Sequence, residues 1–113
     1  MAKTDFIAML REQGLVDERN AGVIAMCQGP GGYGMGLACV KGGTLRIYET
    51  WYHGKPGPLI DEIELKEIRD LKGSAFLLHS YLKFRCRGQR YLLKNFGGAR
   101  NFLAAVREEA AQA

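Results

Sequence analysis

The chain has 113 residues and a mass of 12.5 kDa, the size of one domain with its own hydrophobic core. Hydrophobic residues make up 47% and charged residues 25%, and no apolar run reaches the roughly 18 residues of a membrane-spanning helix, which favours a soluble globular protein. The net charge of +4 is unevenly distributed, because seven cations and only two carboxylates lie after residue 74. The N-terminus lacks the long uncharged segment of a signal peptide, and we therefore expect a cytoplasmic protein.

The first predicted element is a short helix near the N-terminus. Thr4 or Asp5 is a suitable N-cap, apolar residues recur at helical spacing, and Gly14 is typical of a left-handed helix end. Leu15 and Val16 follow where a hydrophobic contact after a helix falls, so we expect this helix to dock on the rest of the domain. Residues 1–21 are assigned to the N-terminal helix and its polar connector, and residues 22–113 to the main domain.

Three strands are predicted next, at residues 22–28, 35–40 and 44–50. The glycine-rich stretch from Gly29 to Gly34 separates the first two, and Lys41, Gly42 and Gly43 form a tight turn into the third. Apolar and polar residues alternate in the third strand with the period of two of a half-buried strand. These three strands are expected to form an antiparallel meander.

Residues 51–58 contain two prolines and two glycines and predict a loop. A fourth strand is expected over residues 59–65, with Ile63 and Leu65 facing inward and Glu62 and Glu64 facing outward. A fifth strand is expected to begin with Ile68 and Leu71 and to end at residues 72–74.

The last third of the chain determines the predicted architecture. A strand carrying Leu82, Phe84 and Cys86 turns at residues 87–89 into a strand carrying Tyr91 and Leu93. An amphipathic helix of about 14 residues then starts near Gly98 and presents Phe102, Leu103 and Val106. About seven strands and a terminal helix predict an α+β, mainly β fold: a partly open antiparallel barrel, capped by the C-terminal helix and extended by a short N-terminal helix.

Several segments together resemble the bacterial pleckstrin-homology-like (PH-like) domain family over about residues 22–109. They are residues 36–40 followed by 43–48, residues 63–73, and residues 82–96 with the helix through Val106. The resemblance implies a PH-like barrel that binds a peptide, a partner protein or a lipid headgroup, and it implies no catalytic activity. Eukaryotic members that bind phosphoinositides use Lys and Arg around the first hairpin loop, whereas the loop from Gly29 to Gly34 contains no cation.

Basic residues follow the strand near the C-terminus at every second position. Lys83, Arg85 and Arg87 are therefore expected on one face, with Tyr81 in the same parity, and Arg90 and Lys94 on the next strand extend the row. Such a row fits a solvated or intramolecularly paired face, an acidic protein partner, or a nucleic acid or anionic membrane. The sequence leaves these three interpretations open.

Two other groups are candidates for contacts between molecules. Five acidic residues cluster in the fourth and fifth strands, where they either pair within the molecule or meet the basic row of a second copy: Asp61, Glu62, Glu64, Glu67 and Asp70. Trp51, Tyr52 and His53 lie at a strand exit, where the aromatic residues either anchor an interface or fill the core.

The chain shows no motif for catalysis, metal or cofactor binding. The glycine loop is followed by a predicted strand and lacks the Lys-Ser/Thr of a phosphate-binding loop. The chain has an odd number of cysteines, and we expect Cys27, Cys39 and Cys86 to be buried reduced thiols. His53 and His79 are not spaced with these cysteines as metal ligands.

The sequence therefore predicts a non-enzymatic module without cofactors that acts through protein–protein association, by self-assembly or by recognition of a peptide. The expected contacts are Lys83, Arg85, Arg87, Arg90 and Lys94, together with Trp51, Tyr52 and His53. The alternative is a module that binds acidic lipid or nucleic acid through the same cations.

Overall fold

The computed structural model describes residues 3–32, 34–50, 54–76, 79–97 and 99–111. Trp51, Tyr52 and His53, predicted as contact residues, lie outside this range. The elements in chain order are α1 (Lys3–Glu12), β1 (Gly22–Gln28), β2 (Gly34–Lys41), β3 (Thr44–Thr50), β4 (Pro56–Glu64), the 3₁₀ turn η2 (Leu65–Glu67), β5 (Arg69–Phe76), β6 (His79–Cys86), β7 (Gln89–Lys94) and α2 (Arg100–Ala110).

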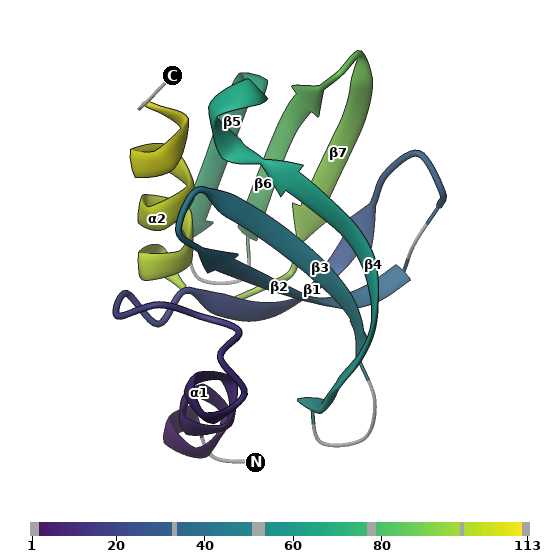
Figure 1. The fold of residues 1–113 in the computed structure, drawn as a ribbon. Helices are drawn as coiled ribbons and strands as arrows, with labels where there is room; N and C mark the ends of the chain where they lie inside the picture. The colour runs from purple at the N-terminus through teal and green to yellow at the C-terminus, as the bar shows by residue number, and fades with distance from the viewer. Residues whose placement is uncertain (1–2, 33, 51–53, 77–78, 98, 112–113) are drawn as a thin grey trace.

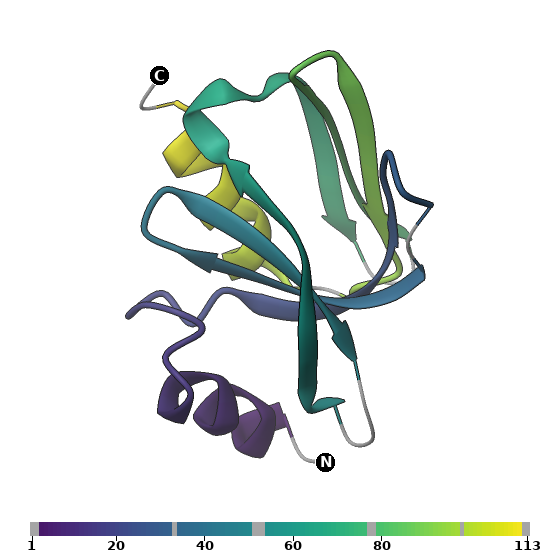
Figure 2. The same cartoon turned by 45° about the vertical axis from the view of Figure 1, so that its right-hand side comes forward.

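The strands form one antiparallel sheet in the order β4-β3-β2-β1-β7-β6-β5. Figures 1 and 2 show the sheet curling around a central core, with α2 against one opening and α1 outside the strands below it. The two edge strands, β4 and β5, are consecutive in the chain and are joined through η2. This confirms the predicted fold class, a mainly β, PH-like, partly open barrel with a C-terminal and a short N-terminal helix.

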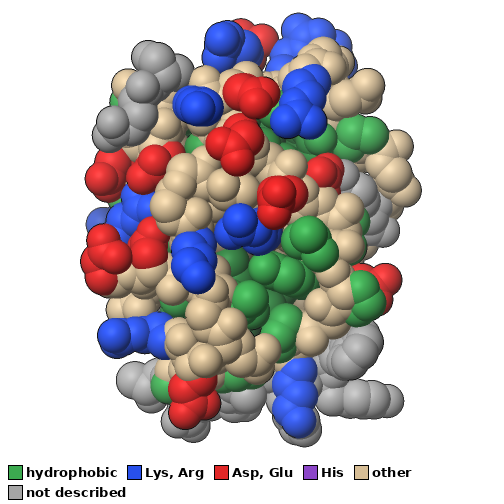
Figure 3. All heavy atoms as spheres, viewed as in Figure 1, with side chains coloured by type: hydrophobic (Ala, Val, Ile, Leu, Met, Phe, Trp, Pro, Cys, Tyr) green, Lys and Arg blue, Asp and Glu red, His purple; other side chains and the backbone are tan. Residues whose placement is uncertain are grey.

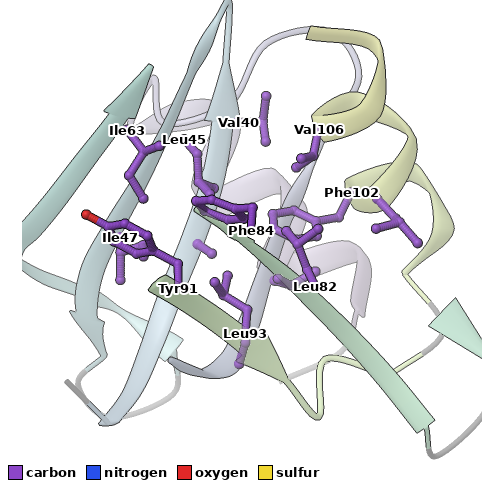
Figure 4. Close-up of a cluster of buried hydrophobic side chains, with 14 of the residues drawn as sticks. Val40, Leu45, Ile47, Ile63, Leu82, Phe84, Tyr91, Leu93, Phe102 and Val106 are labelled. Carbon is purple, nitrogen blue, oxygen red and sulfur yellow. The ribbon is translucent and has the colours of Figure 1, made fainter. Parts of the chain in front are cut away.

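The main core lies inside the curled sheet, where alternate residues of each strand point inward. Figure 4 shows its side chains converging from the strands and from α2. Phe84 of β6 and Tyr91 of β7 stack with ring centroids 5.1 Å apart, and Phe96 packs edge-on against Phe102 of α2 at 5.5 Å. The predicted inward residues Leu82, Phe84, Cys86, Tyr91 and Leu93 are all buried.

Helix α2 covers the opening of the barrel with its apolar side. Phe102, Leu103 and Val106 are buried as predicted, although the helix spans 11 residues from Arg100 and not about 14 from Gly98. Gly73 of β5 lies beneath it, and a Cβ at this position would lie 2.6 Å from Leu103 Cδ1. The helix therefore approaches β5 as closely as it does because residue 73 has no side chain.

Helix α1 packs on the outside of the sheet, as expected from the residues after Gly14. Leu10 and Val16 form a second buried cluster with Leu37 and Cys39 of β2. Gly14 has φ +68° and ends the helix in the left-handed conformation. Thr4 and Asp5 lie within the helix, which begins at Lys3, so the prediction that one of them precedes it as an N-cap is wrong.

Two predicted boundaries are also wrong, both at the edge strands. Pro56 and Pro58, assigned to a loop, belong to β4, which tolerates them because one side of an edge strand has no ladder hydrogen bonds to lose. The fifth strand, predicted to end at residues 72–74, continues through them to Phe76, and Gly73 within it accommodates α2. Leu65 is buried as predicted but belongs to η2.

Neither described helix is long and apolar enough to cross a membrane.

Candidate functional site

Strand β6 separates basic from apolar side chains, as its sequence predicts. Lys83 and Arg85 are exposed, whereas Leu82, Phe84 and Cys86 between them are buried. Tyr81 has the same parity as the cations and is 37% exposed. The strand therefore presents a polar outer face with an aromatic residue toward its beginning.

The register of the neighbouring strands adds further cations to this face, whereas Arg69 of β5, also opposite Arg85, donates to the Ile68 carbonyl at 2.9 Å. Arg90 of β7 lies opposite Arg85, and Lys94 lies opposite Tyr81. On the other side, Lys72 of β5 lies opposite Lys83. Directly opposed residues of antiparallel strands point to the same side of the sheet, so these side chains share one surface, called the basic face below: Lys72, Lys83, Arg85, Arg90 and Lys94.

Lys72 was missed by the sequence analysis, because the fifth strand was predicted to end at residues 72–74. Had β5 been extended through Gly73, the alternation of Lys72 with the half-buried Leu71 and Gly73 would have placed Lys72 on the outer face.

The basic face is hollowed. A depression of about 560 Å³ lies over it and is lined by residues of the β1 end, β5, β6 and β7: Gln28, Gly29, Asp70, Lys72, Lys83, Phe84, Arg85, Arg90, Tyr91 and Leu92. Asp70 is the sole carboxylate in this lining, and its Oδ2 lies 3.8 Å from Arg85 Nη1. The Arg85 side chain is 50% exposed and that of Asp70 69%. Exposed pairs of this kind contribute little to stability and leave the arginine accessible.

Arg87 does not belong to the basic face, contrary to prediction. The strand ends at Cys86, and Arg87 enters the turn to β7 with φ +53°. Its Nε lies 3.5 Å from Glu67 Oε2, and the hydrogen bond and charge of Glu67 raise the pKa of Arg87 above its ordinary value. Parity fails for Arg87 because alternation applies only as far as the strand continues.

The predicted acidic group is engaged within the molecule. Glu62 accepts a 2.8 Å hydrogen bond from Arg46 across β3 and β4, Glu64 accepts one of 3.2 Å from Thr44, and Asp61 accepts one of 3.2 Å from the Tyr91 hydroxyl. Glu67 and Asp70 lie beside arginines, as described above. Figure 3 shows acidic and basic side chains intermixed on the face of the molecule that includes β3 and β4. This pattern corresponds to the intramolecular alternative and not to a separate acidic surface.

The three thiols are buried reduced cysteines, as expected. Burial raises the pKa of Cys27 to about 11 and that of Cys39 to about 12, and the pKa of Cys86 is also raised, mainly by burial. A thiol with a raised pKa is rarely ionised at neutral pH and is a poor nucleophile.

The glycine-rich stretch forms the β1–β2 connection, as predicted. The Gly32 amide donates to the Gly29 carbonyl at 3.0 Å, and Gly32 has φ +79°. The stretch leads into a strand, whereas phosphate-binding loops lead into a helix. Among the described residues, no three His, Cys, Asp or Glu side chains are grouped as a metal site.

The fold and this face together define a class of structure: a PH-like barrel with a hollowed basic surface on strands β5, β6 and β7. No protein-family model matches the chain, and no curated protein matches it either.

Proposed function

We propose that this protein is a non-enzymatic binding module that associates with an acidic segment of another protein through the basic face. The observation that carries this proposal is that Lys72, Lys83, Arg90 and Lys94 have no carboxylate partner among the described residues, although they share one surface. Unneutralised cations gathered at a depression attract a partner that brings its own negative charge. We also propose that the protein belongs to the bacterial PH-like family, and the strand order and the capping helix support this assignment.

Recognition of a partner is favoured over self-assembly. A head-to-tail assembly needs a free acidic surface on the second copy, and the carboxylates predicted for that role lie beside arginines, a threonine and a tyrosine of their own chain. Pairing of strand edges is also disfavoured, because prolines lie in β4 and Arg107 of α2 donates a 2.7 Å hydrogen bond to the Gly73 carbonyl of β5.

The test is fluorescence anisotropy with a labelled peptide of about twelve residues that alternates Glu and Gly, because alternate residues of an extended segment face one side. We expect the wild-type protein to bind it, and the double variant Lys83→Glu/Arg85→Glu to bind at least about tenfold more weakly, since two attractions become repulsions. Binding should also weaken between about 50 and about 500 mM NaCl.

A double variant with the same change in charge away from the basic face, Lys66→Glu/Arg100→Glu, is the control and should bind like wild type, since both residues are exposed and lie on η2 and α2. Equal losses in the two double variants, or no binding by wild type, would contradict the proposal. Tighter binding of a labelled oligothymidylate, or of vesicles of anionic phospholipid, through Lys83 and Arg85 would replace the protein partner with the anion-binding alternative.

A further inference from the structure

The outer face of the sheet continues beyond the cations and becomes apolar. The register aligns a row of residues across the strands β2, β1, β7, β6 and β5: Met35, Met26, Lys94, Tyr81 and Ser74. The next row toward the β6–β7 turn runs through Gln28, Leu92, Lys83 and Lys72, and the row after it holds Arg90 and Arg85. Along the strands the surface therefore changes from cationic near the β6–β7 turn to apolar near the start of β6.

The apolar end is exposed to solvent. Met35 is 56% exposed and Phe76 59%, and Phe76 lies opposite His79, which places it on the same side as Tyr81. Helix α1 does not cover these residues, because its cluster includes Leu37 and Cys39 farther along β2. Exposed large apolar side chains beside a polar rim mark interaction surfaces.

The two ends of this face are close enough for one short segment to contact both. Lys83 and Tyr81 are two residues apart on β6, which corresponds to about 6.6 Å along an extended strand. A segment lying along β6 therefore reaches the apolar row two residues after it leaves Lys83. Lys94 stands in the apolar row itself and is half-buried between Met26 and Tyr81.

We propose that the face recognises a bipartite protein segment, in which alternating acidic residues contact Lys83, Arg85 and Arg90 and an apolar side chain next to them packs against Tyr81 and Phe76 of the adjacent strand β5. This inference rests on the proposed function and specifies its partner.

The distribution of the residues favours a peptide segment over the other anionic partners. Single-stranded nucleic acid requires cations and stacking aromatic residues interleaved along its path, whereas Tyr81 and Phe76 both lie at one end of this face. A bilayer surface is broad, and the cations line a depression of about 560 Å³ that a narrow segment enters more easily.

The test compares two labelled peptides. Both carry alternating Glu residues, and one has Phe two residues after the last Glu where the other has Ser; each is also made with the order reversed, because the direction along β6 is open. For wild type we expect the better Phe peptide to bind about tenfold more tightly than its Ser counterpart, as burial of an aromatic side chain adds to the charge contacts. This difference should shrink to less than about twofold in Phe76→Ser and in Tyr81→Ser.

Leu59→Ser is the matched control, because Leu59 is 49% exposed on β4 and lies outside the three rows described above. It should keep the full difference between the Phe and Ser peptides. Circular dichroism melting of each variant distinguishes lost contacts from lost folding. Phe76→Ser, at the more exposed of the two sites, tests the contact independently if Tyr81→Ser fails to fold.

Equal affinities of wild type for the Phe and Ser peptides in both orders, with binding still abolished by Lys83→Glu/Arg85→Glu, would overturn the bipartite segment and leave the proposed function standing. Failure of every acidic peptide to bind would overturn the proposed function itself.

Discussion

Arg19 connects three parts of the chain that are far apart in sequence. Its guanidinium donates to Asp17 Oδ2 at 2.7 Å, to Glu109 of α2 at 3.0 Å and to the carbonyl of Gly42 in the β2–β3 turn at 3.0 Å. The side chains of Arg19 and Asp17 are only 20% and 16% exposed. The connector after α1 is thereby fixed both to the sheet and to the C-terminal helix.

This arrangement predicts a pH-dependent contribution to stability. The hydrogen bond from Arg19 is the main cause that lowers the pKa of Asp17 well below its ordinary value of 3.8. A carboxylate with a lowered pKa in the folded state stabilises the fold above its unfolded pKa, and the stabilisation is lost as the pH falls below that value. Asp17→Asn should therefore lower the free energy of unfolding by about 1–3 kcal/mol at neutral pH and by clearly less near pH 2, because the stabilisation is lost only as the pH falls from the unfolded toward the lowered folded pKa, measured by urea denaturation.

Glu18→Gln serves as the control, because Glu18 is the exposed neighbour of Asp17 and its carboxylate makes no hydrogen bond or ion pair with any residue that the structure describes. It should leave the unfolding midpoint within about 0.5 kcal/mol of wild type. A loss of stability in Asp17→Asn that is the same at both pH values would show that the effect comes from packing and not from the carboxylate charge.

At this scale the sequence predicted some residues of the basic face and not others. Lys83, Arg85, Arg90 and Lys94 could be placed because alternation along two clear strands determines which face each side chain takes. Arg87 could not, because its position depends on where the strand ends, and Lys72 could not, because its strand was ended too early. The contacts of Arg19 join residues 17, 42 and 109, and no local pattern in the sequence relates them.

Among the elements, the contact between α2 and β5 depends most directly on one residue. An added methyl group at Gly73 would lie 2.6 Å from Leu103 Cδ1 and 3.1 Å from the backbone oxygen of Tyr81, so both the helix and β6 restrict it. Gly73→Ala should destabilise the protein by about 1–3 kcal/mol, measured by urea denaturation, because α2 must move away from the strand. The 2.7 Å hydrogen bond that Arg107 donates to the Gly73 carbonyl would then lengthen as well.

The neighbouring substitution Ser74→Ala adds no atoms at this contact and should change the stability by less than about 0.5 kcal/mol. A Gly73→Ala protein as stable as wild type would mean that α2 adjusts to the methyl group at no cost.

The same elements show why the boundaries were harder to predict than the order of the strands. Glycine and proline usually interrupt strands, and this general tendency placed Pro56 and Pro58 in a loop and ended the fifth strand at residues 72–74. Both exceptions depend on tertiary position, since β4 and β5 are edge strands and Gly73 lies under a helix. The hydrophobic alternation of β3, β6 and β7 reports on local burial and was sufficient to predict those strands.

At the scale of the whole molecule, the described residues form two cores of unequal size. The large one fills the barrel, and the small one lies between α1 and the outer surface of β2 and contains Cys39. Leu10→Ala removes a fully buried side chain from the small core and should weaken the docking of α1, at a cost of about 2–5 kcal/mol if the helix stays in place. Native-state thiol labelling followed by mass spectrometry should then modify Cys39 several-fold faster than in wild type, with Cys27 and Cys86 unchanged.

Leu103→Ala is the corresponding change in the large core. It should lower the stability of the whole barrel and speed the labelling of all three cysteines together. Equal acceleration of the three thiols in Leu10→Ala would show that α1 and the barrel unfold as one unit.

The edges of the sheet have a further consequence for the behaviour of the protein in concentrated solution. An unprotected edge strand can template the growth of intermolecular β-sheet, the route by which many β-rich proteins form aggregates. Here prolines interrupt the donors of β4, and the bulge between Arg69 and Lys72, together with the Arg107 hydrogen bond, makes β5 an irregular template. The open barrel is thereby protected from fibril formation without being closed, and its outer face remains free for other molecules.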